Sequence, residues 1–269
     1  MAHAQQLEFV RAVASALARD WSGRRVLEIG AYDVNGSIRG YFAGSRYTGV
    51  DLVEGPGVDL VGDGHAIAFP EGSFDLSVSC ECFEHDPNWF ATFMNMYRST
   101  APGGALVFTC ASRGRPEHGT RRTKPTSSPG TQSIGSDYYR NLTAADFRRR
   151  APLDRLFSSC FFHYNPPSAD LYFCGVKAGR DPLFERTVDE VRASALQAVA
   201  AVNRANAARQ AAARSDRPVP RRWLSAVAQW PVKAAALLPD PWYQDFRFAY
   251  DGLKKRAAAP FRRAVRGLP

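Results

Sequence analysis

The residues whose types and spacing best suit ligand binding are two carboxylates and a glycine near the start of the chain. Glu28 and Gly30 stand at the end of an apolar run, and Asp51 follows Gly30 after 21 positions. A glycine lets the backbone turn sharply after a strand, and a carboxylate about 20 residues later is typical of one that binds ribose hydroxyls. The stretch from Gly30 to Gly36 lacks the middle glycine that would cradle a pyrophosphate. The pattern therefore favours a nucleoside ligand without phosphates.

Glu81, Glu84 and His85 form a second group, placed after a later apolar run. In open α/β sheets, ligands bind at the edge where such strands end. A His or a carboxylate there can take the proton of an acceptor hydroxyl and add about 10²- to 10⁴-fold to a rate. We take His85 as the first candidate for this base, with Glu84 beside it. In the alternative interpretation, the Glu84-His85 pair only anchors the loop and helix that follow.

Residues 111–142 predict a long loop, because they show no sustained periodicity and are rich in Gly, Pro, Ser and Thr. A loop of this length in a compact domain is typically a lid or a binding loop. His118, which lies near four arginines and Lys124, is therefore the third catalytic candidate. The arginines favour an acceptor with a carboxylate, phosphate or sugar-nucleotide group. A solvated basic surface loop is the alternative interpretation.

Alternating strand and helix patterns supply the elements that position these residues. Helical spacing predicts an amphipathic helix over 4–19. A short helix is expected over 37–42, and residues 89–100 suit another. Strands are expected over 24–30, 47–52, 58–61, 74–80 and 105–110, followed by a hairpin of 156–164 and 170–177. The repetition of strand, loop and helix is that of parallel-sheet units. The fold class is therefore α/β: a Rossmann-like, seven-stranded, mostly parallel sheet with a closing antiparallel hairpin and helices on both faces.

The distribution of charge predicts a boundary near residue 179. Residues 1–179 carry 18 Lys and Arg against 18 Asp and Glu, whereas residues 180–269 carry 17 against 8 and thus the whole net charge of +9. We therefore expect a domain over 1–179 and a basic helical extension over 180–269. A heptad stripe of Ala and Val that starts at Phe184 predicts a long helix, which is expected to dock on the domain. Residues 221–238 combine basic, aromatic and apolar side chains, as segments at membrane interfaces do.

Four motifs together carry a resemblance to a known family. They are VLEIGAYDVNGS, YTGVDL, VGDGHAIAFPEGSFDLSVSCECFEH and APGGALVFTCAS, in this order. Over roughly residues 20–178 the chain resembles the class I S-adenosylmethionine-dependent methyltransferases, in particular the small-molecule branch called the type 11 methyltransferase domain. The resemblance implies S-adenosylmethionine as the cofactor.

The resemblance also implies roles for individual residues. Glu28 and Gly30 would lie beside the methionine part of the cofactor, and Asp51 would bind the ribose. Asp63 and Gly64 would face the adenine. The expected cofactor-binding set is Glu28, Gly30, Tyr32, Gly36, Asp51, Leu52, Asp63, Gly64 and Glu81. The alternatives are a structural carboxylate at Glu28, a turn cap at Asp51, and simple turn chemistry at Asp63.

We expect methyl transfer to a small-molecule acceptor, with a hydroxyl of a sugar, glycan or secondary metabolite as the favoured target. The choice of oxygen rests on the hydroxyl-rich loop 111–142 and on the lack of an amino-group motif after residues 74–80. The alternative is a cofactor-binding platform whose basic tail docks to an anionic membrane, a nucleic acid or a protein partner. Nucleic acid is disfavoured, because no fold signature of a nucleic-acid-binding protein accompanies the charge.

Neither a metal nor a disulfide is expected. The histidines and acidic residues form no HxxxH motif or paired-carboxylate cluster, and methyl transfer to an ordinary nucleophile needs no redox metal. The five cysteines form no CxxC pair and mostly fall in apolar runs, which favours reduced core residues. The chain shows neither a secretory signal nor an apolar run of about 18 residues, which predicts a cytoplasmic protein, with membrane contact at most peripheral.

Overall fold

The computed structural model describes residues 3–215 and 229–266, and the chain divides into two compact units, Met1–Arg209 and Gln210–Pro269. The first unit extends beyond residue 179, where the charge distribution changes. The separate roles expected for residues 1–179 and 180–269 stay a prediction.

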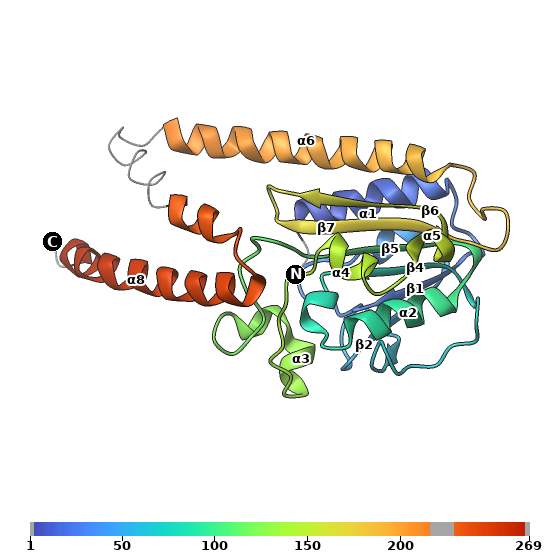
Figure 1. Cartoon of the computed structure of the whole chain (residues 1–269), viewed down its shortest axis with the longest axis horizontal. Helices are drawn as coiled ribbons and strands as arrows, with labels where there is room; N and C mark the ends of the chain where they lie inside the picture. Colours follow the sequence, from blue (N-terminus) through green and yellow to red (C-terminus); the bar gives the residue numbers. More distant parts are fainter. Residues whose placement is uncertain (1–2, 216–228, 267–269) are drawn as a thin grey trace. The chain divides into compact units, whose positions relative to one another are not determined.

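The first unit is built on one seven-stranded sheet (Figure 1). Its strands are β1 Arg25–Ile29, β2 Arg46–Asp51, β3 Leu60–Val61, β4 Phe74–Cys80, β5 Thr100–Ala111, β6 Phe157–Asn165 and β7 Asp170–Lys177. They lie in the order β3-β2-β1-β4-β5-β7-β6. The first five are parallel, and β7 runs antiparallel to both of its neighbours. The expected sheet with its closing hairpin is confirmed.

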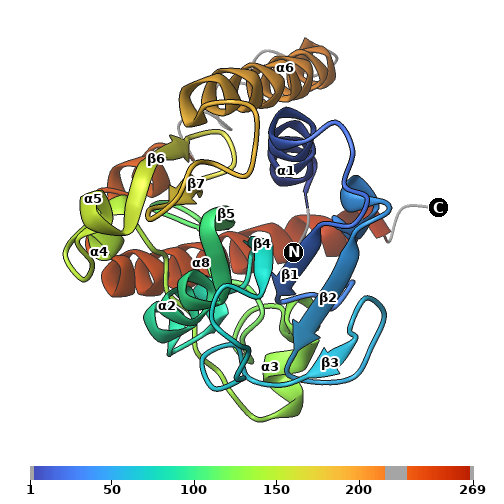
Figure 2. The same cartoon turned by 90° about the vertical axis from the view of Figure 1, so that its right-hand side faces the viewer.

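Helices cover both faces of this sheet (Figure 2). On one face lie α1 Ala4–Leu17 and the first turns of α6 Val188–Ser215. On the other lie α2 Trp89–Ser99, α4 Ala144–Arg148 and α5 Leu153–Leu156. Strand side chains alternate between the two layers: Val26 packs with α1 and Leu27 packs with α2. A parallel sheet that is buried on both faces explains why its strands read as nearly continuous apolar runs.

The long helix α6 docks as its heptad stripe predicts. Val188, Val191, Ala195 and Val199 are all buried in the same core cluster as α1. Farther along the helix, Asn203 donates a hydrogen bond of 2.8 Å to Asn165 at the end of β6. Docking on the sheet layer is therefore confirmed over these turns.

Two expected elements are shorter than their sequence patterns indicate. The segment 37–42 forms a 3₁₀ turn, η1 Arg39–Phe42, and β3 contains only Leu60 and Val61. Before β3, the Asp59 side chain accepts a hydrogen bond of 2.8 Å from the Gly49 amide. The Asp59 amide in turn donates to the Gly49 carbonyl oxygen at 2.8 Å, and the regular pairing of β3 with β2 begins at Leu60 and Val50.

The segment 111–142 forms a long connection with two short turns, as expected. These are η3 Pro125–Ser127 and α3 Pro129–Ser133, and the turn that follows β4 is η2 Phe83–His85. After the connection, Thr143 and Asp146 form a capping box at the start of α4.

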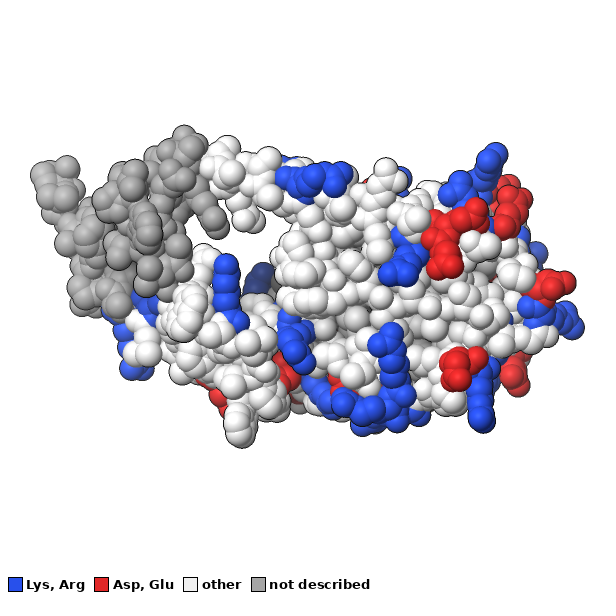
Figure 3. All heavy atoms as spheres, turned by 45° about the horizontal axis from the view of Figure 1, so that its top comes forward, with Lys and Arg blue, Asp and Glu red and all other residues white. Residues whose placement is uncertain are grey.

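The second unit contains α8, Asp240–Arg266. Residues 216–228 lie outside the described residues, so the predicted interfacial segment 221–238 is described only from residue 229. Across residues 3–215 and 229–266, no helix combines the length and the apolar character needed to span a bilayer. On the face seen in Figure 3, basic and acidic side chains are interspersed.

Candidate active site

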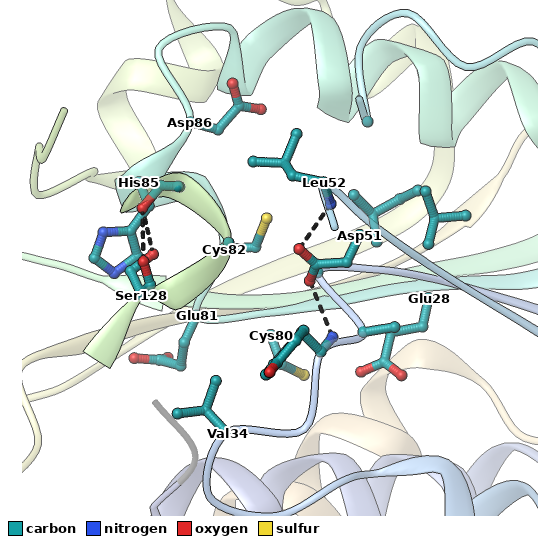
Figure 4. A pocket seen from close by; sticks show the side chains of 18 of the residues that line it. Glu28, Val34, Asp51, Leu52, Cys80, Glu81, Cys82, His85, Asp86 and Ser128 are labelled. Carbon is teal, nitrogen blue, oxygen red and sulfur yellow. Dashed lines mark hydrogen bonds between the residues drawn. The ribbon is translucent and has the colours of Figure 1, made fainter. Parts of the chain in front are cut away.

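One cavity of about 290 Å³ lies at the carboxyl ends of β1, β2 and β4. All nine residues expected to bind the cofactor line it: Glu28, Gly30, Tyr32, Gly36, Asp51, Leu52, Asp63, Gly64 and Glu81. In the close-up, Glu28 and Asp51 lie on one side of the cavity, and Glu81 and His85 lie on the other (Figure 4). The structure thus brings the predicted residues together, while their individual roles stay predictions.

Gly30 makes the sharp turn that opens the cavity after β1. Its φ of +85° lies in the left-handed region, and a Cβ at this position would stand 2.7 Å from the Cβ of Cys82. The amides of Gly30 and Ala31 both donate to the Val50 carbonyl oxygen, at 2.9 and 3.0 Å. Only glycine meets both the backbone and the space requirement here.

Asp51 ends β2 with its carboxylate at the cavity wall. Its two oxygens accept hydrogen bonds from the Tyr32 amide at 2.9 Å and the Leu52 amide at 2.8 Å. Burial raises the pKa of Asp51 above its usual value, although both amide hydrogen bonds act to lower it. The carboxylate therefore joins the loop after β1 to the end of β2.

Glu28 is a buried carboxyl group that is bound by a tyrosine hydroxyl. Its Oε2 accepts a hydrogen bond of 2.6 Å from the Tyr47 hydroxyl. Burial raises the pKa of Glu28 to about 7, because the charged form loses its hydration. A cationic ligand group next to Glu28 would restore the ionised form.

Asp63 and Gly64 form the wall of the cavity beyond β3. Asp63 Oδ1 lies 2.5 Å from His65 Nδ1. A Cβ on Gly64 would stand 2.7 Å from Ile29 Cγ2 and 2.8 Å from Thr92 Cγ2. The turn therefore packs closely against Ile29 and Thr92 at Gly64.

Glu81 follows β4 with a φ of +52°, a conformation that non-glycine residues rarely adopt. Its Oε2 lies 3.8 Å from the guanidinium of Arg115, which also lies 3.3 Å from Asp170. Burial by itself raises the pKa of Glu81, but His3 and Arg115 outweigh it, and the pKa is lowered. Glu81 is thus an ionised carboxylate held in place by cations.

His85, Glu84 and His118 come together although His118 is far from the other two along the chain. His118 Nε2 lies 4.0 Å from Glu84 Oε1, and the rings of His85 and His118 are 5.0 Å apart. His85 lines the cavity, and within the described residues Glu84 and His118 are outside the cavity lining.

The ionisation of these three groups is set mainly by burial. Burial lowers the pKa of His118 to about 4 and that of His85 below its usual value. Burial and the nearby Glu81 raise the pKa of Glu84 to about 8. At neutral pH all three side chains are uncharged, so both imidazoles offer lone pairs.

Sequence reasoning missed the part of the cavity wall that the loop supplies. Ser127, Ser128, Thr131 and Ser136 line the cavity, and a Cβ on Gly130 would stand 2.9 Å from Asp51 Oδ1. The loop therefore approaches the end of β2. The abundance of Ser and Thr in residues 111–142 was the one signal, but it specified no position.

Comparison with known protein families finds one match within the chain. Residues 27–108 match the family model described as a methyltransferase domain. This segment contains β2, β3, β4 and most of β1 and β5, with the whole set of residues expected to bind the cofactor. The match shows a methyltransferase domain over these residues, in agreement with the motifs of the sequence.

Solved methyltransferase structures resemble this one, each at low identity. The 1,6-didemethyltoxoflavin-N1-methyltransferase of Burkholderia thailandensis is 18% identical with a TM-score of 0.45, over 65% of this chain and 80% of that one. Phosphoethanolamine N-methyltransferase 2 of Haemonchus contortus is 16% identical with a TM-score of 0.48, over 64% of this chain and 52% of that one. An S-adenosylmethionine-dependent methyltransferase of Mesorhizobium loti is 16% identical with a TM-score of 0.42, over 61% of this chain and 95% of that one. The comparison with curated proteins gave no match.

The cavity of this methyltransferase fits its cofactor, S-adenosylmethionine. Glu28 presents a buried carboxyl group that suits the ammonium of the methionine part, and Asp51 presents an acceptor for ribose hydroxyls. Gly30 lines the same cavity, and its backbone packs directly against Cys82. When bound, the cofactor supplies a methyl group on a sulfonium.

Proposed function

We propose that this methyltransferase methylates a hydroxyl oxygen of a small-molecule acceptor: a sugar, a glycan or a secondary metabolite. One observation carries the proposal. The hydroxyl-bearing residues Ser127, Ser128 and Thr131 line the same cavity as His85. Glu28 lies on the other side of the cavity from His85 (Figure 4). A cofactor next to Glu28 and Asp51 leaves the wall near His85 for an acceptor.

The chain contributes orientation, exclusion of water and a path for the acceptor proton. Hydroxyl side chains of the loop 111–142 suit the hydrogen bonds of a polyol, and the loop covers the cavity from the side of Asp51. Positioning the acceptor near the methyl group is the main requirement of an in-line displacement. His85 is neutral and lines the cavity, so it is the residue placed to promote loss of the acceptor's proton.

The acceptor and the methylated atom can be identified with isotopically labelled cofactor. The full chain is incubated with methyl-labelled S-adenosylmethionine and fractionated cell extract, and labelled products are characterised by mass spectrometry. The proposal predicts label in a methyl ether. Label confined to nitrogen or carbon would reject it.

Replacing His85 tests its place in the reaction. His85→Ala should lower kcat by about 10²-fold or more while changing the affinity for S-adenosylmethionine by less than about twofold, because it faces the acceptor side. The matched control is His163→Ala, on β6 and outside the cavity lining of the described residues, which should leave both quantities unchanged. Unchanged kcat in His85→Ala would remove His85 from the mechanism.

We also propose that the tail makes a peripheral contact with an anionic membrane. Trp230, Leu237 and Trp242 are exposed by 71%, 76% and 67%, in a region that also carries Lys233 and Arg247. Exposed aromatic and apolar side chains with basic neighbours are typical of interfacial segments. Such contact suits a protein of the cytoplasm, which stays our prediction for the compartment.

A further inference from the structure

Glu84, His85 and His118 form a compact group of ligand-type side chains beside the cavity. One ligand atom from each residue lies within 4.8 Å of the others. Glu84 and His85 sit in the single turn η2, and His118 reaches them from the loop 111–142. The backbone holds the two segments together, because the Arg140 amide donates to the Glu84 carbonyl oxygen at 2.8 Å.

The polar atoms of this group are buried and unsatisfied. Glu84 is 0% exposed, His85 5% and His118 9%. Within residues 3–215 and 229–266, hydrogen-bond partners are lacking for both oxygens of Glu84, both ring nitrogens of His85 and Nε2 of His118. Buried polar atoms without partners are rare, and each costs about 1–3 kcal/mol. Five such atoms at one place indicate a missing ligand.

His118 is already oriented for coordination. Its Nδ1 lies 3.1 Å from the Pro116 carbonyl oxygen, which can only accept, so Nδ1 carries the proton. The lone pair therefore resides on Nε2, the atom that lies 4.0 Å from Glu84 Oε1. A ring N–H bound to a backbone carbonyl is the usual way in which proteins orient a metal-binding histidine.

The approach of the loop to His85 is also close. Gly119 has a φ of +73°, and a Cβ there would stand 2.7 Å from His85 Cε1. The Gln132 side chain donates to the Gly119 carbonyl oxygen at 2.8 Å. These contacts place His118 beside His85 rather than in solvent.

A neighbouring group of His3, Glu81 and Asp170 also has buried polar atoms without hydrogen-bond partners, but it differs in its close ion pairs. His3 Nε2 lies 2.8 Å from Asp170, and Arg115 lies 3.3 Å from Asp170 and 3.8 Å from Glu81. In this second group the carboxylates are balanced by a histidine and a guanidinium. Glu84 has no such cation among the ion pairs of the described residues, apart from the distant contact with His118.

We propose that Glu84, His85 and His118 bind a divalent first-row transition-metal ion. Two imidazole nitrogens and one carboxylate oxygen suit Zn²⁺, Mn²⁺, Co²⁺ or Fe²⁺, and they suit Ca²⁺ poorly. Ligand bonds of about 2.0–2.2 Å place neighbouring ligand atoms about 3–3.5 Å apart, so closing the site requires side-chain movements of about 1 Å. This proposal reverses the expectation from sequence that no metal is bound.

The bound ion would take part in the proposed methyl transfer, and this part of the inference rests on the proposed function. Because His85 lines the cavity, an ion held by its ring would lie next to the acceptor, with one or more coordination positions open for an acceptor oxygen. His85 would then promote loss of the hydroxyl proton as a ligand of the ion rather than as the base. The proton itself passes to water. The acceptor class is accordingly one whose hydroxyl oxygen can coordinate a cation.

Metal binding is measured on the full chain without any acceptor. The protein is stripped with a chelator and titrated with Mn²⁺ and Co²⁺ by calorimetry, and the visible absorption of bound Co²⁺ reports its ligands. We expect binding of one ion per chain. The variants Glu84→Gln, His85→Gln and His118→Gln should each weaken binding by at least about tenfold. His163→Gln, the matched histidine control, should bind like the wild type.

Thermal melts and the affinity for S-adenosylmethionine show whether the variants remain folded. Glu84→Gln keeps the shape of the neutral side chain, so it provides a folded variant if a histidine variant is unstable. Wild-type protein that binds neither ion, or Glu84→Gln that binds as well as the wild type, overturns the inference. Methyl transfer by a protein that binds no ion overturns this inference alone, whereas ion binding without methylation of any hydroxyl acceptor overturns the proposed function alone.

Discussion

At the scale of residues, the site depends on carboxyl groups whose ionisation is set by burial. Glu28 and Asp51 line the same cavity, but they differ in partners: Asp51 accepts from two amides and Glu28 from one hydroxyl. Amides help to keep Asp51 ionised, which suits an acceptor for ribose hydroxyls. Burial raises the pKa of Glu28 to about 7, so this side chain becomes a carboxylate most readily when a cation binds beside it.

Glu28 should therefore make the affinity for S-adenosylmethionine depend on pH. Below the raised pKa the free protein holds a proton that the ammonium of the cofactor must expel, so affinity should be about tenfold weaker at about pH 6 than at about pH 8. Calorimetry in buffers of different ionisation enthalpy measures both the affinity and the proton release. Glu28→Gln, which has no proton to lose, should show weaker binding without this pH dependence. A flat profile in the wild type would contradict the assignment.

At the scale of elements, an aromatic cluster fixes the sheet to the helices beneath the site. The ring of Phe108 on β5 stacks on Phe147 of α4 at 4.7 Å and on Phe173 of β7 at 5.0 Å. Phe83, in the segment that carries Glu84 and His85, lies 5.1 Å from Phe108. The turn with the catalytic candidates is thereby anchored to the core, so its position depends on β5.

Truncating Phe108 should accordingly destabilise the first unit. Phe108→Ala removes a fully buried ring and leaves a cavity, which should lower the free energy of unfolding by about 3–5 kcal/mol. Chemical denaturation measures this difference. Phe248→Ala, at a half-exposed ring on α8, is the control and should change it by less than about 0.5 kcal/mol. Equal effects of the two changes would refute the role of the cluster.

At the scale of the whole molecule, the sequence predicts elements and local sites better than contacts between distant segments. The sheet was predictable because its strands are apolar runs separated by Gly and Pro, and the cavity because Glu28, Asp51 and Asp63 each lie at or just past a strand end. The meeting of His118 with Glu84 was not predictable. It depends on the path of residues 111–142, which have no periodicity that sequence reasoning can use.

The basic tail is expected to bind anionic membranes. The full chain should sediment with vesicles that contain phosphatidylserine but not with vesicles of phosphatidylcholine alone, and added salt should release it. Replacing both Trp230 and Trp242 by alanine should weaken this binding, because the exposed rings would otherwise enter the interface. Equal sedimentation with both lipids would show that no anionic membrane is recognised.

S-adenosylmethionine is expected to bind in the cavity at the carboxyl ends of β1, β2 and β4, and calorimetric titration of the wild type and of Asp51→Ala measures this binding. We predict that the wild type binds one cofactor per chain and that Asp51→Ala binds it at least about 10²-fold more weakly, with an unchanged melting temperature. Asp154→Ala, in α5 and away from the cavity lining of the described residues, should bind like the wild type. Normal affinity in folded Asp51→Ala would contradict the account.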